Sequence, residues 1–339
     1  MTIVCADTYG SDQFEGIPVR TVPSVSVPGI HDIDVAVTST WWLSRILADI
    51  APDVVHVASP FVLGAVGVKA AKRLGLPVVA VFQTDIPGFA RHYGLSSVAP
   101  LADAHVRRIH GEADLTLVPS SASHAYLRSL GIERLARWGR GVNTSIFTPT
   151  LRDENLRARW SPDAGAHVVV GYLGRLAPEK GVERLADIQT LRGVQLVVIG
   201  DGPALSTLEE ALPKARFVGR RSGEDLGRHV ASLDILVAPG ENETFCQVIQ
   251  EGMAAGVPVV APAVGGPRDL INPGADGFLY EPGDVTDMLE HVSLLVDDSR
   301  LRVRMGMNGF AKVAPKTWLG VTDELLGHYH SVMHAQLAA

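Results

Sequence analysis

The chain has 339 residues, of which 46% are hydrophobic and 20% charged, and its formal net charge is -7. This length and apolar fraction predict two folded domains and argue against a disordered chain. The acidic balance argues against a nucleic-acid partner. Cys5 and Cys246 form no C-x-x-C pair, so we expect a cytoplasmic protein without a disulfide framework or a zinc site. No apolar run approaches the roughly 20 residues of a membrane span.

Short β-branched runs alternate with helical segments along most of the chain. The runs predicted as buried strands are Val54–Val57, Val78–Phe82, Leu115–Val118, Val168–Leu173, Leu196–Ile199, Ile235–Ala238 and Val257–Ala261. The segments predicted as helices are Ser39–Ile50, Phe61–Leu74, Ala102–Ala113, Val182–Leu191, Leu205–Ala211, Phe245–Ala255 and, at the end of the chain, Thr317–Leu337. This alternation predicts an α/β protein with doubly wound parallel sheets.

The alternation is interrupted once, between Asn143 and Ala166, by two proline-containing stretches around a short charged helix. We therefore predict two facing Rossmann-like domains, over residues 1–148 and 167–315, joined by a linker over 149–166 and followed by a C-terminal helix over 316–339. Ligands of such sheets bind beyond the carboxyl ends of the strands, so the loops that follow the strands are where chemistry is expected.

Two cations occupy the loop that follows the predicted strand Val168–Leu173. Arg175 and Lys180 lie in Gly-Arg-Leu-Ala-Pro-Glu-Lys-Gly, a glycine-bounded turn that leads into a helix. Such a turn can bring both cations and helix N–H groups to one diphosphate, whereas a solvated loop with two surface cations is the alternative.

Two further loops are weaker signals. Gly200-Asp201-Gly202 follows a strand, and its glycines permit positive φ and a close approach of the backbone to a ligand. A nicotinamide cofactor is disfavoured because no full G-x-G-x-x-G opens a helix here. The segment Ala215–Arg220 predicts a short strand whose backbone either contacts a nucleobase or simply pairs in the sheet.

Two glutamates flank the start of a predicted helix that begins near Thr244 or Phe245. Glu243 and Glu251 lie up to about 12 Å apart along the helix axis, which is the scale of a sugar, a diphosphate and a ribose. Carboxylates accept hydrogen bonds from diols, and the helix N-terminus offers N–H groups to phosphates. The alternative is that Glu243 only complements the helix dipole. Four such segments in one α/β domain favour the ligand site.

Together these segments resemble the retaining glycosyltransferases of family 4, which have the GT-B fold. Gly-Arg-Leu-x-Pro-Glu-Lys-Gly, Gly-Asp-Gly-Pro, Phe-Val-Gly and Glu-x7-Glu occur in the family's order and spacing. In the N-terminal half, Val81–Ala90 with Tyr93-Gly94, and Trp138–Asn143, resemble the branch that makes mannosyl and sulfoquinovosyl lipids. Within that branch the sequence is most similar to the GDP-mannose-dependent α-mannosyltransferases of actinobacteria.

The resemblance implies a role for each matching residue. Arg175, Lys180 and Glu243 would be the catalytic group, with both cations on the diphosphate and Glu243 on the sugar. Donor binding would involve Gly174, Gly202, Phe217, Val218, Phe245, Cys246, Gln247 and Glu251, with Glu251 on the ribose and Phe217 to Gly219 at the base. Gln83, Asp85 and Arg140 would lie on the acceptor or sugar side. No metal or cofactor is implied.

The resemblance also implies transfer of mannose from GDP-mannose to a glycolipid, in the cytoplasm at the inner face of the plasma membrane and with peripheral membrane contact. The alternatives are UDP-glucose or another nucleotide sugar as donor, a small carbohydrate as acceptor, or nucleotide-sugar binding without transfer. Many relatives have His where this chain has Gln83, which cannot shuttle a proton, so we expect Gln83 to hydrogen-bond a hydroxyl. Relatives also open with a strand, a glycine-rich loop and a helix that we expect this N-terminal domain to lack.

Three other features favour structural interpretations. We predict that Trp41 and Trp42 pack into a core rather than contact a membrane interface. Asp32-Ile33-Asp34 matches the D-x-D of metal-dependent transferases, but GT-B enzymes generally work without it. His330 and His334 are expected to be surface histidines rather than a metal site.

Overall fold

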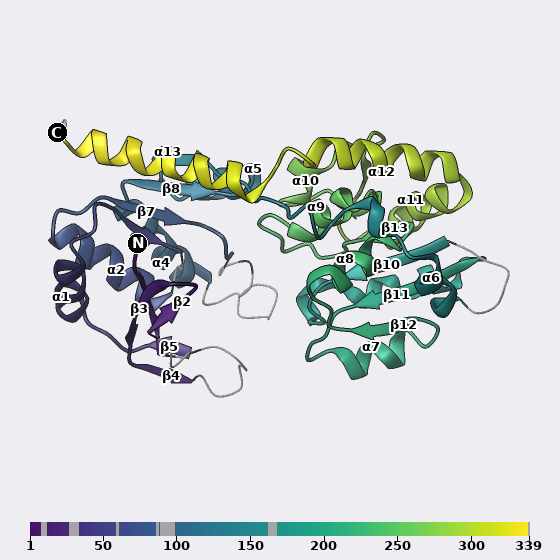
Figure 1. Ribbon diagram of the computed structural model, residues 1–339, viewed down its shortest axis with the longest axis horizontal. Helices are drawn as coiled ribbons and strands as arrows, with labels where there is room; N and C mark the ends of the chain where they lie inside the picture. The colour runs from purple at the N-terminus through teal and green to yellow at the C-terminus, as the bar shows by residue number, and fades with distance from the viewer. Residues whose placement is uncertain are drawn as a thin grey trace. The chain divides into compact units, whose positions relative to one another are not determined.

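The computed structural model describes residues 1–7, 12–26, 34–58, 61–85, 88, 99–161 and 168–337 (Figure 1). Its internal contacts divide the chain into two compact units. The first comprises Met1–Pro119, Ser123–Trp138 and Asp323–Ala339, and the second comprises Ser120–Ala122 and Gly139–Thr322. Among the described helices, none combines the length and the apolar character needed to cross a membrane.

The first unit is built around a parallel sheet with the strand order β6-β7-β8-β9. Its strands are β6 (Val55–Val57), β7 (Val78–Val81), β8 (Leu115–Val118) and β9 (Leu135–Arg137). The helices that connect them are α2 (Val62–Arg73), α4 (Ala99–Glu112) and α5 (Ser121–Ser129). The β7 side chains are all buried, as expected for a strand that is covered on both faces.

Among the described residues, five strands and one helix precede this sheet. The strands are β1 (Ile3–Ala6), β2 (Gln13–Phe14), β3 (Ile17–Val22), β4 (Ser24–Ser26) and β5 (Asp34–Ala36), arranged as β1-β3-β2 and β4-β5. Helix α1 (Thr40–Ile50) begins at Ser39, whose Oγ accepts a hydrogen bond from the Trp42 amide at 3.2 Å. The prediction that Trp41 and Trp42 are core residues was wrong, since they are 61% and 47% exposed. Leu43 and Leu47 face the core instead.

The second unit contains a fully parallel six-stranded sheet in the order β12-β11-β10-β13-β14-β15. The strands are β10 (Val168–Leu173), β11 (Val194–Ile199), β12 (Arg216–Gly219), β13 (Ile235–Val237), β14 (Val259–Pro262) and β15 (Gly277–Tyr280). Two hydrophobic clusters of side chains surround this sheet. If these strands are numbered 1 to 6 along the chain, their order across the sheet is 3-2-1-4-5-6, which is the doubly wound order of dinucleotide-binding folds.

Helices connect and cover these strands. They are α6 (Glu154–Trp160), α7 (Leu205–Ala211), α8 (Gly223–Ala231), α9 (Gln247–Ala254), α10 (Pro267–Leu270), α11 (Val285–Asp297) and α12 (Ser299–Val313), together with the 3₁₀ helices η2 (Pro149–Leu151), η3 (Pro178–Lys180) and η4 (Val182–Thr190). The predicted helix Val182–Leu191 is therefore a 3₁₀ helix. Figure 1 shows α11 and α12 next to each other, and both pack against β15.

The segment 149–166, predicted as a linker, lies within the second unit as far as it is described. Leu156 and Trp160 of α6 are buried in a core cluster of that unit. Arg152 and Arg157 each bind a carboxylate oxygen of Asp234 at 2.8 Å. These contacts make α6 an integral part of the unit, and residues 162–166 lie outside the described part of the chain.

The C-terminal helix α13 (Trp318–Leu337) belongs to both units, because the division falls between Thr322 and Asp323. In the first unit, Val332 is buried in a cluster with Val79 and Leu117. Tyr329 Oη lies 2.6 Å from Nδ1 of His56 on β6. The C-terminal helix thus begins in the second unit and ends in the first.

Candidate functional site

The strand order places two loops of the second unit next to each other. β10 pairs with β11 on one side and with β13 on the other, so the sheet reverses its order between β10 and β13. The loop after β10, residues 174–181, and the loop after β13, residues 238–246, leave the same edge at that point. This is where ligands of doubly wound sheets bind.

The loop after β10 carries the two predicted cations. The hydroxyl of buried Tyr172 donates to the Arg175 carbonyl at 2.8 Å and so fixes the start of the loop. The Arg175 side chain is 62% exposed, and its guanidinium lies 3.9 Å from the buried carboxylate of Glu179. Lys180 ends η3 and is only 29% exposed. Arg175 thus extends into solvent, whereas Lys180 points into the site.

The Gly200-Asp201-Gly202 turn packs against the loop after β10. A Cβ on Gly200 would lie within 3.0 Å of Gly174 backbone atoms, and a Cβ on Gly202 would lie 2.3 Å from the Leu176 carbonyl oxygen. The Leu176 amide donates to the Asp201 carbonyl at 2.9 Å. These glycines therefore allow two loops to approach each other. The sequence had predicted a close approach of this turn to a ligand instead.

The loop after β13 brings Glu243 to Lys180. Lys180 Nζ donates to Glu243 Oε1 at 2.6 Å. The burial of Lys180 lowers its pKa, but the charge and hydrogen bond of Glu243 outweigh that effect and raise the pKa overall. The structure therefore joins two residues 63 positions apart that were predicted separately.

Helix α9 begins at Gln247, two to three residues later than predicted. Cys246 precedes it with φ 72° and ψ 71°, a left-handed conformation that is rare for residues with a side chain. Its thiol is buried, and burial, followed by the charge of Glu243, raises its pKa well above the ordinary value. The N–H groups of the first turn of α9 therefore lie directly after the loop that carries Glu243.

Glu251 lies on α9, one turn beyond Gln247. Burial raises its pKa from 4.5 to about 7. Among the described residues, none forms a hydrogen bond or ion pair with its carboxylate. A half-buried carboxylate without a protein donor is suited to receive hydroxyl groups from a ligand.

Gln247 connects the start of α9 to the segment that carries Arg140. Its Nε2 donates to the Gly141 carbonyl at 2.8 Å, while its Oε1 is buried without a partner in the described part of the chain. A Cβ on Gly139 would lie 3.9 Å from the Phe245 ring. Burial lowers the pKa of Arg140. Phe245, Gln247 and the segment around Arg140 therefore form one packed group.

The remaining predicted residues belong to other elements. Phe217 and Val218 are on β12, at the outer edge of the sheet, and the Val218 carbonyl accepts a hydrogen bond from Arg221 at 2.6 Å. In the first unit, Gln83 and Asp85 follow β7. Gln83 Nε2 donates to the Ala58 carbonyl at 2.6 Å, and Asp85 Oδ1 accepts from the Gly88 amide at 2.9 Å.

Some predictions fall wholly or partly outside the described residues. Apart from Gly88, the stretch 86–94 that contributed to the family resemblance is outside them, and so are Asp32 and Ile33 of the D-x-D sequence. His330 and His334 are exposed, as predicted, and His334 Nδ1 lies 2.7 Å from the His330 carbonyl oxygen. Within the described ranges, no group of three or more His, Cys, Asp or Glu side chains is arranged to hold a metal ion.

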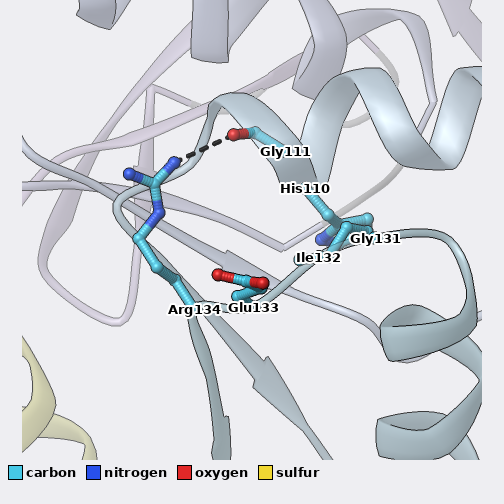
Figure 2. A pocket seen from close by; sticks show the side chains of 6 residues that line it. All are labelled: His110, Gly111, Gly131, Ile132, Glu133 and Arg134. Carbon is cyan, nitrogen blue, oxygen red and sulfur yellow. Dashed lines mark hydrogen bonds between the residues drawn. The ribbon is translucent and has the colours of Figure 1, made fainter.

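The first unit has a pocket at the edge of its sheet opposite to the one that Gln83 and Asp85 follow (Figure 2). It is lined by the end of α4 and by the turn that precedes β9, hence at the amino ends of β8 and β9. Arg134 donates to the Gly111 carbonyl across it at 2.9 Å. Gln83 and Asp85 follow the carboxyl end of β7, so this pocket is separate from the predicted acceptor side.

Sequence reasoning missed the groups that hold the loop after β13. Arg184 pairs with Glu241, and Glu241 also accepts a hydrogen bond from the Gly283 amide at 2.9 Å. The buried Tyr280 hydroxyl lies 3.5 Å from the Pro239 carbonyl oxygen. In the sequence, only the position of Glu241 two residues before Glu243 pointed to this group. That position does not identify Arg184 as the partner of Glu241.

Both units contain a Rossmann-like parallel sheet, which is the GT-B fold predicted from the sequence, and cations and carboxylates gather at the reversal point of the second sheet. The chain belongs to the family 4 glycosyltransferases, since a glycosyltransferase described below is 45% identical to it over 97% of its length. The model for glycosyl transferases group 1 matches residues 154–312, and the model for glycosyltransferase family 4 matches residues 1–146. The predicted family and fold class are confirmed.

Two relatives illustrate the similarity in sequence. The chain is 45% identical over 336 residues to the GDP-mannose-dependent alpha-mannosyltransferase of Mycobacterium tuberculosis (strain CDC 1551 / Oshkosh), covering 97% of this chain and 87% of the relative. It is 41% identical over 319 residues to the protein of the same name from Corynebacterium glutamicum, covering 94% and 76%.

Solved structures show the same fold at lower identity. Sucrose-phosphate synthase from Thermosynechococcus elongatus matches with a TM-score of 0.80 and 20% identity, over 97% of this chain and 88% of that one. The HepE protein of Anabaena in complex with UDP matches with a TM-score of 0.76 and 20% identity, over 93% and 87%. At such identities the comparison concerns the fold alone.

Proposed function

We propose that the protein is a retaining transferase that moves mannose from GDP-mannose to a glycolipid acceptor. One observation carries the donor: three relatives, each 41–45% identical over at least 94% of this chain, bear the name GDP-mannose-dependent alpha-mannosyltransferase. The glycolipid acceptor rests on the resemblance of the N-terminal half to enzymes of mannosyl and sulfoquinovosyl lipids.

The donor site supports this proposal through its charges. Arg175 and Lys180 bind the diphosphate, and they stabilise the negative charge that GDP gains as it leaves. The amides from Phe245 to Gln247 contact the phosphate next to the sugar. Glu243 accepts hydrogen bonds from the mannose, and Glu251 accepts them from the ribose hydroxyls.

The other predicted residues contact the base of the donor and the acceptor. Phe217 and Val218 present their backbone to the guanine, Gly174 and Gly202 keep the adjoining loops free of side chains, and the Cys246 backbone contributes to the phosphate contact. On the acceptor side, Gln83, Asp85 and Arg140 orient the hydroxyl that attacks.

The reaction proceeds on one face of the sugar. The bond between the mannose C1 and the donor phosphate breaks, and C1 forms a bond to the acceptor oxygen on the same face. The acceptor proton passes to the departing phosphate oxygen, so no protein nucleophile is required. Because Arg175 and Lys180 supply the positive charge, we propose that transfer needs no metal ion or other cofactor.

The test is a transfer assay with isotope-labelled nucleotide sugars and a membrane lipid extract. We expect label from GDP-mannose in the lipid fraction, an α-linkage in the product, and equal rates with and without a chelator. Replacing Lys180 by Ala should abolish transfer, whereas replacing the exposed Glu290 of α11 by Gln should not. Label from UDP-glucose instead would assign another donor, label in a soluble sugar would assign another acceptor, and binding without transfer would contradict the proposal.

A separate vesicle-binding assay addresses location. We propose that the enzyme works at the cytoplasmic face of the membrane through peripheral contact. Recovery of the protein with vesicles of bacterial lipid, and its release by high salt, would support this. Recovery only in the supernatant would contradict it.

A further inference from the structure

The cation expected to bind the donor diphosphate already has a carboxylate partner in the protein. Lys180 Nζ and Glu243 Oε1 are 2.6 Å apart, and the two side chains are 29% and 19% exposed. A charge-assisted contact that is partly withdrawn from water is stronger than an ordinary surface ion pair. An anionic ligand that approaches Lys180 therefore has to compete with Glu243.

We propose that this competition makes Glu243 a specificity-determining residue, through which the site prefers a nucleoside diphosphate that carries a sugar over the same diphosphate without one. The inference rests on the proposed function, because it takes Lys180 as the diphosphate ligand. It adds a role for the ion pair beyond the sugar contact of Glu243.

A bare diphosphate meets an unfavourable charge arrangement at this pair. If it shares Lys180 with Glu243, one cation is divided between two anions, so each anion is held more weakly than it would be alone. If it displaces Glu243, it leaves a carboxylate that is 81% buried without its cation, which is costly. Either outcome reduces the affinity for the free nucleotide.

The sugar supplies what the displaced carboxylate needs. An ionised carboxylate only accepts hydrogen bonds, and the hydroxyls of a hexose donate them. A donor that carries its sugar can therefore bind Lys180 through its phosphate while its sugar hydroxyls donate hydrogen bonds to Glu243. The cost of separating the pair is offset only for the complete donor.

The surroundings offer Glu243 no substitute cation. Within the described residues, Lys180 is the only cation paired with Glu243. The neighbouring Arg184 is engaged by Glu241 and by the Pro239 carbonyl. A Cβ on Gly240 would lie 3.3 Å from Glu243 Oε1, so the absence of a side chain there leaves room for the pair.

The Lys180–Glu243 pair also affects the release of the product. After transfer, the nucleoside diphosphate remains without the hydroxyls that had satisfied Glu243. The carboxylate of Glu243 then pairs with Lys180 again, which lowers the affinity for the nucleoside diphosphate. The same residue thus favours binding of the donor and departure of the spent nucleotide.

The experiment is a double-mutant cycle on nucleotide binding, measured by titration calorimetry with GDP and GDP-mannose. Glu243→Gln should bind GDP about tenfold more tightly than the unmodified protein and should lose the preference for GDP-mannose over GDP. In a Lys180→Met background, Glu243→Gln should change GDP affinity less than about twofold, because no pair remains to break. Glu243→Ala should repeat the pattern and excludes a residual hydrogen bond from Gln.

Two results would overturn the inference. One is an unchanged or weaker GDP affinity in Glu243→Gln, with thermal unfolding showing that the variant is folded. The other is an equal gain in the Lys180→Met background, which would indicate a general charge effect. Because the cycle measures binding, it is independent of transfer. If the protein prefers uridine nucleotides, the cycle with UDP and UDP-glucose decides this inference while the proposed donor fails.

Discussion

Replacing Glu251 by Gln should stabilise the protein and damage its site at the same time. Burial raises the pKa of Glu251 from 4.5 to about 7, so the folded protein holds this proton more tightly than the unfolded chain does. The stability that the group contributes is fully present below pH 4.5 and is lost as the pH rises towards 7. Above that pH, an ionised carboxylate is held half-buried without a donor among the described residues.

The difference of about 2.5 pKa units corresponds to about 3 kcal/mol at about 1.4 kcal/mol per unit. Glu251→Gln keeps the shape of the side chain and removes the charge. At pH 8 the variant should therefore be about 3 kcal/mol more stable than the unmodified protein, and at pH 5 the difference should fall below about 1 kcal/mol. Its affinity for GDP should fall at least about tenfold, because the ribose hydroxyls lose a charged acceptor.

Denaturant unfolding at pH 5 and pH 8, with GDP titration at pH 8, measures both effects. Glu290→Gln on α11 is the matched control, since it removes an exposed carboxylate from the same unit. A variant that gains no more stability at pH 8 than this control would refute the desolvation argument. Unchanged GDP binding would refute the assignment of Glu251 to the ribose.

Three further substitutions test the loops and the C-terminal helix. Gly200→Ala would bring a Cβ into the backbone of the neighbouring loop, so we expect a loss of more than about 3 kcal/mol in the free energy of unfolding, and an unaltered midpoint would be contrary evidence. Cys246→Val places a β-branched residue at φ 72° and should cost about 1–2 kcal/mol and weaken GDP binding; retention of both would argue against the left-handed conformation. Tyr329→Phe removes the hydroxyl that contacts His56 and should cost about 1 kcal/mol in the same unfolding assay, with no change in GDP affinity.

The strands of the second unit could be predicted well because they are buried on both faces. Val168–Leu173 is a strand with the predicted bounds, and Leu196–Ile199 lies within a slightly longer one. The first strands of the chain could not be found in this way. Strand β3, Ile17–Val22, has one buried residue, Val22, and carries Pro18 and Arg20, so its apolar signal is weak.

Local conformations at the site were harder to predict. Nothing in the residue type of Cys246 indicates a positive φ, so the sequence placed the start of α9 too early. The predicted helix Val182–Leu191 has the apolar spacing of an α-helix, which does not distinguish it from the 3₁₀ helix that forms. In both cases the conformation is set by tertiary contacts rather than by propensity.

Three departures from ordinary folding preferences lie at one edge of the sheet in the second unit. Cys246 has a left-handed backbone, Glu251 is a half-buried carboxylate, and Lys180 is paired with Glu243 away from full solvent. The first two cost stability, and the ion pair has to be separated before Lys180 can bind a phosphate, whereas the strands beside them are packed apolar residues. A sequence tolerates such costs where a ligand offsets them, and under the proposed function these ligand groups are phosphates for Lys180, hydroxyls for Glu243 and Glu251, and a phosphate near the strained start of α9. The edge where folding is least favourable is therefore the edge where donor binding has the most free energy to gain.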